Sequence, residues 1–210
     1  MSEGSAARAA EVLDRDRSVV VVVDVQGRLA QSVHESATVL AATGRLLRIA
    51  GLFEIPVILT EQYPEGLGPT EASVLEAFDA LTGPKRKVAK TLFGCCGDEG
   101  FEAALDDLLS GVDEDRRQVV VAGIEAHVCV MQTVLELLRR GVQVHVCWEA
   151  TSGRGRTYRR WALERMQGAG AIVTNHESAA FEWARGKDHP RFRDLNLLLR
   201  EGQIGGEQDV

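Results

Sequence analysis

Three residues of this sequence could together hydrolyse a small molecule: a carboxylate, an ammonium group and a thiol. Asp24 follows the valine-rich residues 18–23, Lys90 ends the stretch KRKVAK, and Cys129 follows an apolar strand, a glycine and a short loop. Each comes where a strand of a parallel sheet would end, and open α/β sheets carry their sites at the carboxyl ends of strands. We therefore predict that these side chains meet in one pocket.

Cys129 is the best candidate nucleophile because it stands at the start of a helix predicted over residues 128–140. The positive end of a helix dipole favours a thiolate. Backbone N–H groups at a helix start lack intrahelical partners and can donate to an oxyanion. The alternative is that Cys129 is a small buried apolar residue.

Asp24 and Lys90 supply the complementary groups. A carboxylate at the end of so apolar a strand is costly unless it is paired or faces a cleft, and it could exchange a proton with Cys129. The ammonium group of Lys90 could keep the carboxylate ionised and lower the pKa of the thiol. Alternatively, Asp24 caps a turn and Lys90 is one more surface lysine, with Lys85 and Lys87 as competitors.

Strands and helices alternate along the whole chain, which predicts a three-layer α/β/α fold with a mostly parallel sheet of about six strands. We expect one domain over residues 1–210, with a core at about 17–200 and flexible, polar, Gly-rich ends. The expected strands cover residues 18–23, 55–60, 87–90, 118–122, 142–146 and 171–174. The expected helices cover residues 36–50, 74–81, 101–109, 128–140, 158–167 and 178–184.

Composition narrows the class of partner and compartment. The net charge is −7 and the pI is near 5.3, which argues against nucleic acid and anionic membranes as partners. The one basic stretch, residues 154–165, is interpreted as a solvated helix face, with phosphate binding as the alternative. No apolar leader precedes the first strand, and two of the four cysteines are adjacent. We expect free thiols in a cytoplasmic protein.

Metal and cofactor motifs are missing from the sequence. It contains no HExxH, no paired CxxC and no HxH, and no complete phosphate-binding loop. His127 lies two residues from Cys129, so it is a poor general base and a better pocket residue. We expect neither a metal nor a cofactor.

Four segments resemble the isochorismatase-like cysteine hydrolase family. They are VVVVVDVQ, ILTEQYPEGLGPT, KVAKTLF and GIEAHVCVMQT, spread over residues 19–133. The segment VHVCWEATSGR resembles the family's next strand and loop. The resemblance implies the isochorismatase-like (Rossmann-like) hydrolase fold, and it is strongest toward members described only by their isochorismatase domain.

The resemblance also implies a role for each matching position. Asp24 corresponds to the family's acid/base, Lys90 to its lysine and Cys129 to its nucleophile. It implies a cis peptide bond between Ile124 and Glu125, which would turn the N–H of Glu125 toward that of Cys129. These two N–H groups would form an oxyanion hole.

Two departures from the family pattern bear on the substrate. The segment Thr60-Glu61-Gln62-Tyr63 lacks the histidine of nicotinamidase-like metal sites, which argues against a catalytic zinc and against nicotinamide. Members that cleave a vinyl ether lack the thiol, so Cys129 favours acyl transfer.

We therefore expect hydrolysis of a small amide or other C–N bond through a thioester. We place Gln26, Gln62, Tyr63 and His127 in the pocket wall and expect a homo-oligomer, a dimer or larger. Two alternatives remain open: a thiol-independent ether hydrolase using Asp24 and Lys90, and a binding or scaffold protein without turnover.

Overall fold

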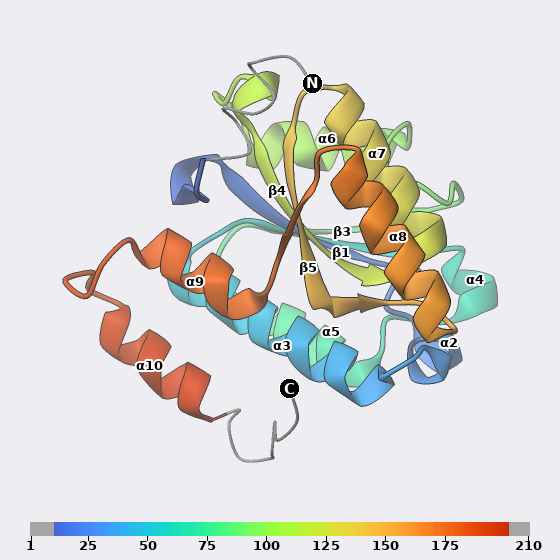
Figure 1. Cartoon of the computed structure of the whole chain (residues 1–210), viewed down its shortest axis with the longest axis horizontal. Helices are drawn as coiled ribbons and strands as arrows, with labels where there is room; N and C mark the ends of the chain where they lie inside the picture. The colour runs from blue at the N-terminus through green and yellow to red at the C-terminus, as the bar shows by residue number, and fades with distance from the viewer. Residues whose placement is uncertain (1–10, 202–210) are drawn as a thin grey trace.

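Six strands form one sheet in which every neighbouring pair is parallel (Figure 1). The structure is a computed structural model that describes residues 11–201, so the ends that we expect to be flexible lie almost wholly outside the described residues. The strand order is β3-β2-β1-β4-β5-β6. The strands are β1 (Ser18–Val23), β2 (Val57–Gln62), β3 (Lys85–Lys90), β4 (Gln118–Ile124), β5 (Gln143–Ser152) and β6 (Ile172–Thr174).

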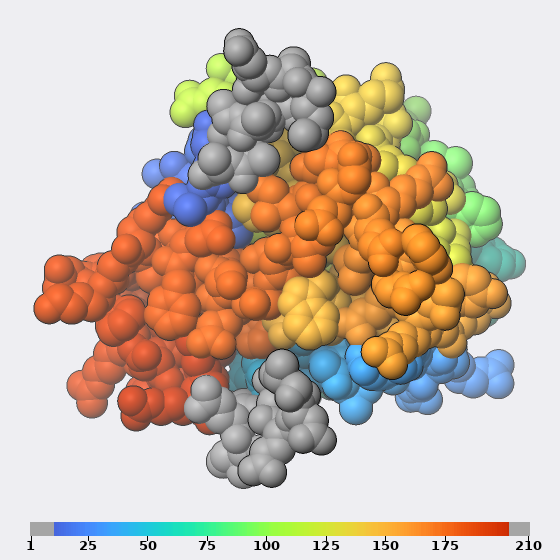
Figure 2. Space-filling model, in the orientation of Figure 1, coloured from blue at the N-terminus to red at the C-terminus, as the bar shows by residue number. Residues whose placement is uncertain are grey.

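Helices cover both faces of the sheet, which confirms the predicted three-layer fold. One face carries α3 (Ser36–Phe53), α5 (Ala72–Asp79), α9 (His176–Ala184) and α10 (Phe192–Arg200), and the other carries α6 (Glu99–Leu108), α7 (Met131–Arg139) and α8 (Arg156–Gly168). Figure 2 shows α8, α9 and α10 covering one side of the molecule. The shorter elements are α2 (Gly27–Ser32), α4 (Pro64–Leu67), η1 (Arg15–Arg17), η2 (Glu114–Arg116) and η3 (Ala126–Val130).

The valines of β1 feed two hydrophobic cores because successive side chains of a strand point to opposite faces. Val20 and Val22 pack with α3 and α9, whereas Val19, Val21 and Val23 pack with α6 and α7. A strand buried on both faces explains why this run is apolar throughout.

Several element boundaries differ from the predicted ones. β2 continues to Gln62, so the predicted strand end at Thr60 lies inside the strand, and β5 continues to Ser152. The helices α2 and α10 were not predicted, and α4 interrupts the predicted loop at residues 63–69. Polar residues extend β2 and β5 because the neighbouring strands supply hydrogen bonds that local polarity does not reveal.

The longest helix, α3, is long and apolar enough by composition to cross a membrane. In the structure it packs lengthwise against the sheet, and eight of its residues are buried. Its apolar character is therefore used in the core described here.

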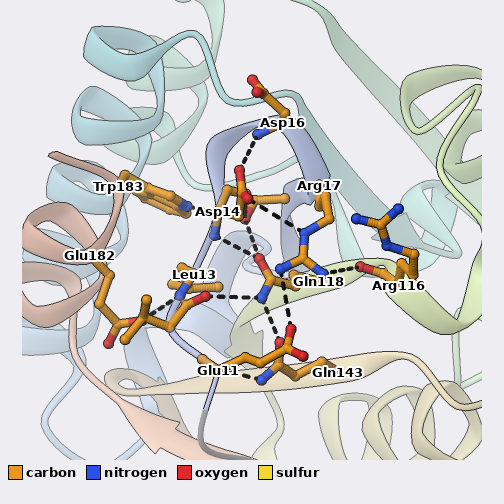
Figure 3. A network of polar contacts seen from close by, with 12 residues as sticks. Glu11, Leu13, Asp14, Asp16, Arg17, Arg116, Gln118, Gln143, Glu182 and Trp183 are labelled. Carbon is orange, nitrogen blue, oxygen red and sulfur yellow. Dashed lines mark hydrogen bonds and ion pairs between the residues drawn. The ribbon is translucent and has the colours of Figure 1, made fainter. Parts of the chain in front are cut away.

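Polar contacts tie the segment before β1 to the side of the sheet at which the strands begin, here called its amino edge (Figure 3). The Gln118 side chain accepts a hydrogen bond from the Asp14 N–H at 2.7 Å and donates to the Val12 carbonyl at 3.2 Å. The Leu13 N–H donates to Glu182 of α9 at 2.7 Å. This network stabilises the amino edge. The loops that carry the candidate site lie on the opposite side of the sheet, at which the strands end, here called its carboxyl edge.

Candidate active site

The candidate site lies between β1 and β4, where the strand order of the sheet reverses. From β1 the chain builds outward to β2 and β3, and it then crosses to β4 on the other side of β1. In open α/β sheets, the loops that follow two such strands lead to opposite faces, and ligands bind beyond the carboxyl ends of these strands. Asp24 follows β1, and the segment that carries Cys129 follows β4.

The backbone of Asp24 lies in the left-handed region, with φ +53°. Aspartate tolerates this conformation better than most residues that carry a side chain. The turn ends β1 and brings the carboxylate onto the α6–α7 face of the sheet, where only 1% of the residue is exposed.

Asp24 and Lys90 form a buried ion pair, as the sequence predicts. Lys90 Nζ donates to Asp24 Oδ2 at 2.6 Å and to the carbonyls of Leu92 and Phe93 at 3.0 and 2.9 Å. Three acceptors match the three donors of an ammonium group. Lys90, only 2% exposed, is thus the buried lysine of its strand, whereas Lys85 caps the end of α5 and Lys87 reaches Glu61.

Cys129 lies beside this pair, but not at the start of an α-helix. It falls within η3, a π-helical turn, and α7 begins two residues later at Met131. The N–H groups of Val128 and Val130, on either side of Cys129, both donate to the Glu125 carbonyl, at 3.0 and 3.3 Å. The wider turn carries the thiol close enough to Asp24 and Lys90 for both side chains to act on its pKa.

The expectation of a lowered thiol pKa is wrong for the resting protein. Burial and the negative charge of Asp24 raise the pKa of Cys129 to about 12, and the opposing effect of Lys90 is smaller. A buried thiol beside a negatively charged carboxylate keeps its proton. The resting state is therefore a neutral thiol beside an Asp24–Lys90 ion pair, and a thiolate forms only if Asp24 takes the proton.

The backbone that precedes Cys129 has the geometry implied by the family resemblance at residues 124 and 125. The peptide bond between Ile124 and Glu125 is cis. The Glu125 carboxylate accepts from Arg154 Nε at 2.9 Å and from the Arg154 N–H at 3.3 Å. This ion pair fixes Glu125 between the ends of β4 and β5.

The structure places the four predicted pocket residues in different roles. Gln26 is buried, and its amide group bonds the backbone of Gln62 and the Gly68 carbonyl, so it braces the loop after β2. Gln62 reaches the Thr91 carbonyl, Tyr63 is 55% exposed, and His127 stacks on Tyr158 with ring centroids 4.6 Å apart. Gln62 and Tyr63 stand at the end of β2 and His127 lies two residues before Cys129, and their place in the pocket wall stays a prediction.

Two further residues at the site were not selected from the sequence. Thr60 donates to Asp24 Oδ1 at 2.6 Å, and the buried Cys95 thiol lies 3.9 Å from Thr60 Oγ1. The available signal for Thr60 was its alternation with Ile58, which puts both side chains on the α6–α7 face. All four cysteines are free, and residues 11–201 contain no group of three or more histidine, cysteine, aspartate or glutamate residues arranged for a metal.

Comparison with known proteins assigns the family. The family model described as the isochorismatase domain matches residues 18–178, which include every residue of the site. The chain belongs to the isochorismatase family. Isochorismatase domain-containing protein 1 of Danio rerio is 38% identical over 87% of this chain and 61% of its own length, and protein 2A of Mus musculus is 34% identical over 89% and 84%.

Solved structures support the isochorismatase fold. A MAR1 ribonuclease from Caenorhabditis elegans is 31% identical, with a TM-score of 0.80 over 95% of this chain and 100% of that one. YcaC from Pseudomonas aeruginosa, solved with covalent acrylamide, is 25% identical, with a TM-score of 0.77 over 92% and 98%. An octameric Escherichia coli hydrolase of unknown specificity, 23% identical, has a TM-score of 0.74 over 90% and 95% and supports the fold alone.

Proposed function

We propose that this isochorismatase-family protein is a cysteine-dependent hydrolase of a small amide or other C–N bond. The observation that carries the proposal is the burial of the Cys129 thiol beside the ion pair between Asp24 and Lys90, whose charges both act on it. It supplies a nucleophile, a base and a countercharge at one point. The family membership supports a hydrolase.

Nucleophilic attack begins from the neutral thiol. Asp24 takes the proton as the sulfur of Cys129 attacks the substrate carbonyl, so the thiolate forms only together with the new C–S bond. Lys90 stays within 2.6 Å of the carboxylate and keeps a positive charge beside the reacting groups. The N–H groups of Glu125 and Cys129 stabilise the oxyanion.

Breakdown of the tetrahedral intermediate returns the proton. The protonated Asp24 donates to the leaving amine while the C–N bond breaks, which leaves a thioester on Cys129. Water then loses a proton to Asp24 and attacks the thioester, and the sulfur recovers its proton when the acid leaves. One carboxylate thus serves as base and acid in turn.

The decisive experiment combines turnover with covalent trapping. A panel of small amides is screened by ammonia release, and Cys129→Ala is compared with Cys96→Ala, a cysteine that contacts none of the trio. We expect Cys129→Ala to lower kcat by at least about 10³-fold, as losses of covalent nucleophiles do, and Cys96→Ala to keep the wild-type rate. Acrylamide should modify Cys129 and abolish turnover in parallel.

Two results would contradict the proposal. Full turnover in Cys129→Ala would favour the thiol-independent hydrolase that uses Asp24 and Lys90. Cleavage of RNA with no activity on amides, in a preparation where Cys129→Ala is equally active, would favour the activity named for the Caenorhabditis elegans relative.

We also propose that copies of this chain associate. Large apolar side chains are exposed in the segments that follow β2 and β3: Tyr63, Leu67, Leu92 and Phe93. Residues of this kind are enriched at the centre of protein interfaces. Light scattering coupled to gel filtration should give a dimer or larger species, and a monomer at micromolar concentration would contradict this.

A further inference from the structure

A row of three buried polar groups leads from the loop after β3 to the candidate base. The thiol of Cys95 lies 3.9 Å from Thr60 Oγ1, and Thr60 Oγ1 lies 2.6 Å from Asp24 Oδ1. Cys95 and Thr60 are fully buried and Asp24 nearly so. Water cannot replace these buried contacts. The orientation of each polar group therefore depends on the hydrogen bond that it makes to the next group in the row.

The direction of these hydrogen bonds is determined. A hydroxyl group has one proton to donate, and an ionised carboxylate can only accept. The Thr60 proton therefore points to Asp24, and a lone pair of Thr60 Oγ1 faces the Cys95 thiol. Burial raises the pKa of Cys95 to about 11, so this thiol keeps its proton and donates it.

We infer that Thr60 is a positioning residue for Asp24 and that Cys95 holds the Thr60 hydroxyl in its donating orientation. This inference rests on the proposed function, in which Asp24 is the base. With Oδ1 bonded to Thr60 and Oδ2 bonded to Lys90, the plane of the carboxylate is fixed, and its remaining lone pairs can face the Cys129 thiol.

The measurable consequence is a change in the pH at which Asp24 becomes protonated and can no longer act as the base. The titratable groups that act on the Cys129 thiol are Asp24, Lys90 from β3 and Cys95 from the loop after it. β2 contributes the neutral Thr60. A carboxylate that loses a hydrogen-bond donor is protonated at higher pH, and for one hydroxyl donor the shift is about one pH unit.

Labelling of Cys129 by acrylamide measures this pH without any substrate. The labelled peptide is quantified by mass spectrometry from about pH 4 to about pH 9, where the coupled Asp24–Cys129 pair gives an acid limb followed by a plateau. We expect Thr60→Val to move the midpoint of this limb up by about one unit, which lowers the rate about tenfold on the limb. Thr60→Ser should restore the wild-type midpoint.

Two comparisons separate this effect from a general loss of packing. Thr43→Val removes an equally buried hydroxyl, which bonds the Val39 carbonyl within α3, and should leave the midpoint unchanged. Cys95→Ala should move the midpoint in the same direction by less, and it carries the test should Thr60→Val fail to fold.

The outcomes distinguish this inference from the proposed function. A wild-type acid limb that neither Thr60→Val nor Cys95→Ala moves would overturn the role of Thr60 and leave Asp24 as the base. A wild-type profile without any acid limb, unchanged in Asp24→Asn, would count against Asp24 as the base and so against the proposed function as well.

Discussion

The polar groups of the site show how a buried charge becomes tolerable at the scale of single residues. Lys90 Nζ satisfies its three hydrogens with one carboxylate and two carbonyls, and Asp24 receives donors on both oxygens. Removing one partner of such a pair leaves an uncompensated charge, which costs about 3–5 kcal/mol. A buried ion pair is therefore weak evidence for stability, and a role in function or in conformational specificity explains it better.

His145 is buried without such compensation. It is 1% exposed near the start of β5, and among residues 11–201 neither of its ring nitrogens has a hydrogen-bond partner. Burial lowers the pKa of His145 to about 4 from 6.5. Between these values the unfolded chain binds a proton that the folded protein refuses, so stability falls as pH falls.

We expect the free energy of unfolding to drop by up to about 3 kcal/mol between pH 7 and pH 4 because of His145 alone. In His145→Leu this part of the acid sensitivity should disappear. Urea unfolding at several pH values measures it, with His34→Gln as the control, since the His34 side chain is 32% exposed. An equal acid loss in wild type and His145→Leu would show that the imidazole is protonated in the fold.

At the scale of elements, the site depends on the close approach of β1 and β4. Gly123 of β4 has φ +129°, and a Cβ added there would lie 2.1 Å from the Val23 carbonyl oxygen. Val23 directly precedes Asp24, and Gly123 lies two residues before Glu125. Only glycine lets the two strand ends, and hence the base and the nucleophile loop, come this close.

Gly123→Ala should therefore destabilise the protein by at least about 3 kcal/mol, since a backbone clash and a disfavoured φ add together. In any folded fraction we expect acrylamide labelling of Cys129 to be slower. Gly44→Ala is the matched control, because Gly44 lies inside α3 with nothing within 4 Å of an added Cβ. It should raise stability by up to about 1 kcal/mol. Similar unfolding midpoints for the two variants would contradict this reading of Gly123.

At the scale of the whole molecule, the polar network around Gln118 and the reacting groups of the candidate site lie at opposite edges of the sheet. Gln118 is fully buried at the amino edge and joins the segment before β1 to β4 and β5 (Figure 3). The reacting groups lie at the carboxyl edge. Changes at the amino edge should therefore alter stability without altering the site.

Gln118→Leu leaves the Asp14 N–H and the Val12 carbonyl without their partner, so we expect a loss of about 2–4 kcal/mol. The pH profile of Cys129 labelling should not change. Gln167→Leu, on the exposed side of α8, is the control and should be close to neutral. A shifted labelling profile in Gln118→Leu would show that the two edges are coupled.

The sequence alone determined the layered fold and the candidate trio. Alternating apolar runs predict strands and helices, and each of Asp24, Lys90 and Cys129 follows or ends one of them, so their edge of the sheet could be predicted from local patterns. The start of α7, the length of β2 and the helices α2 and α10 could not, because backbone partners supplied by neighbouring elements decide where such segments begin and end.

Only the tertiary structure decided the protonation state of the nucleophile and the neighbours of the base. The position of Cys129 near a helix suggested a thiolate, but burial and the nearby carboxylate oppose it. Thr60 and Cys95 are far from Asp24 in the chain and meet it only through β1–β2 pairing and the loop after β3. Electrostatic energy depends on distance through space and on exclusion of water, and neither quantity is encoded in residue order.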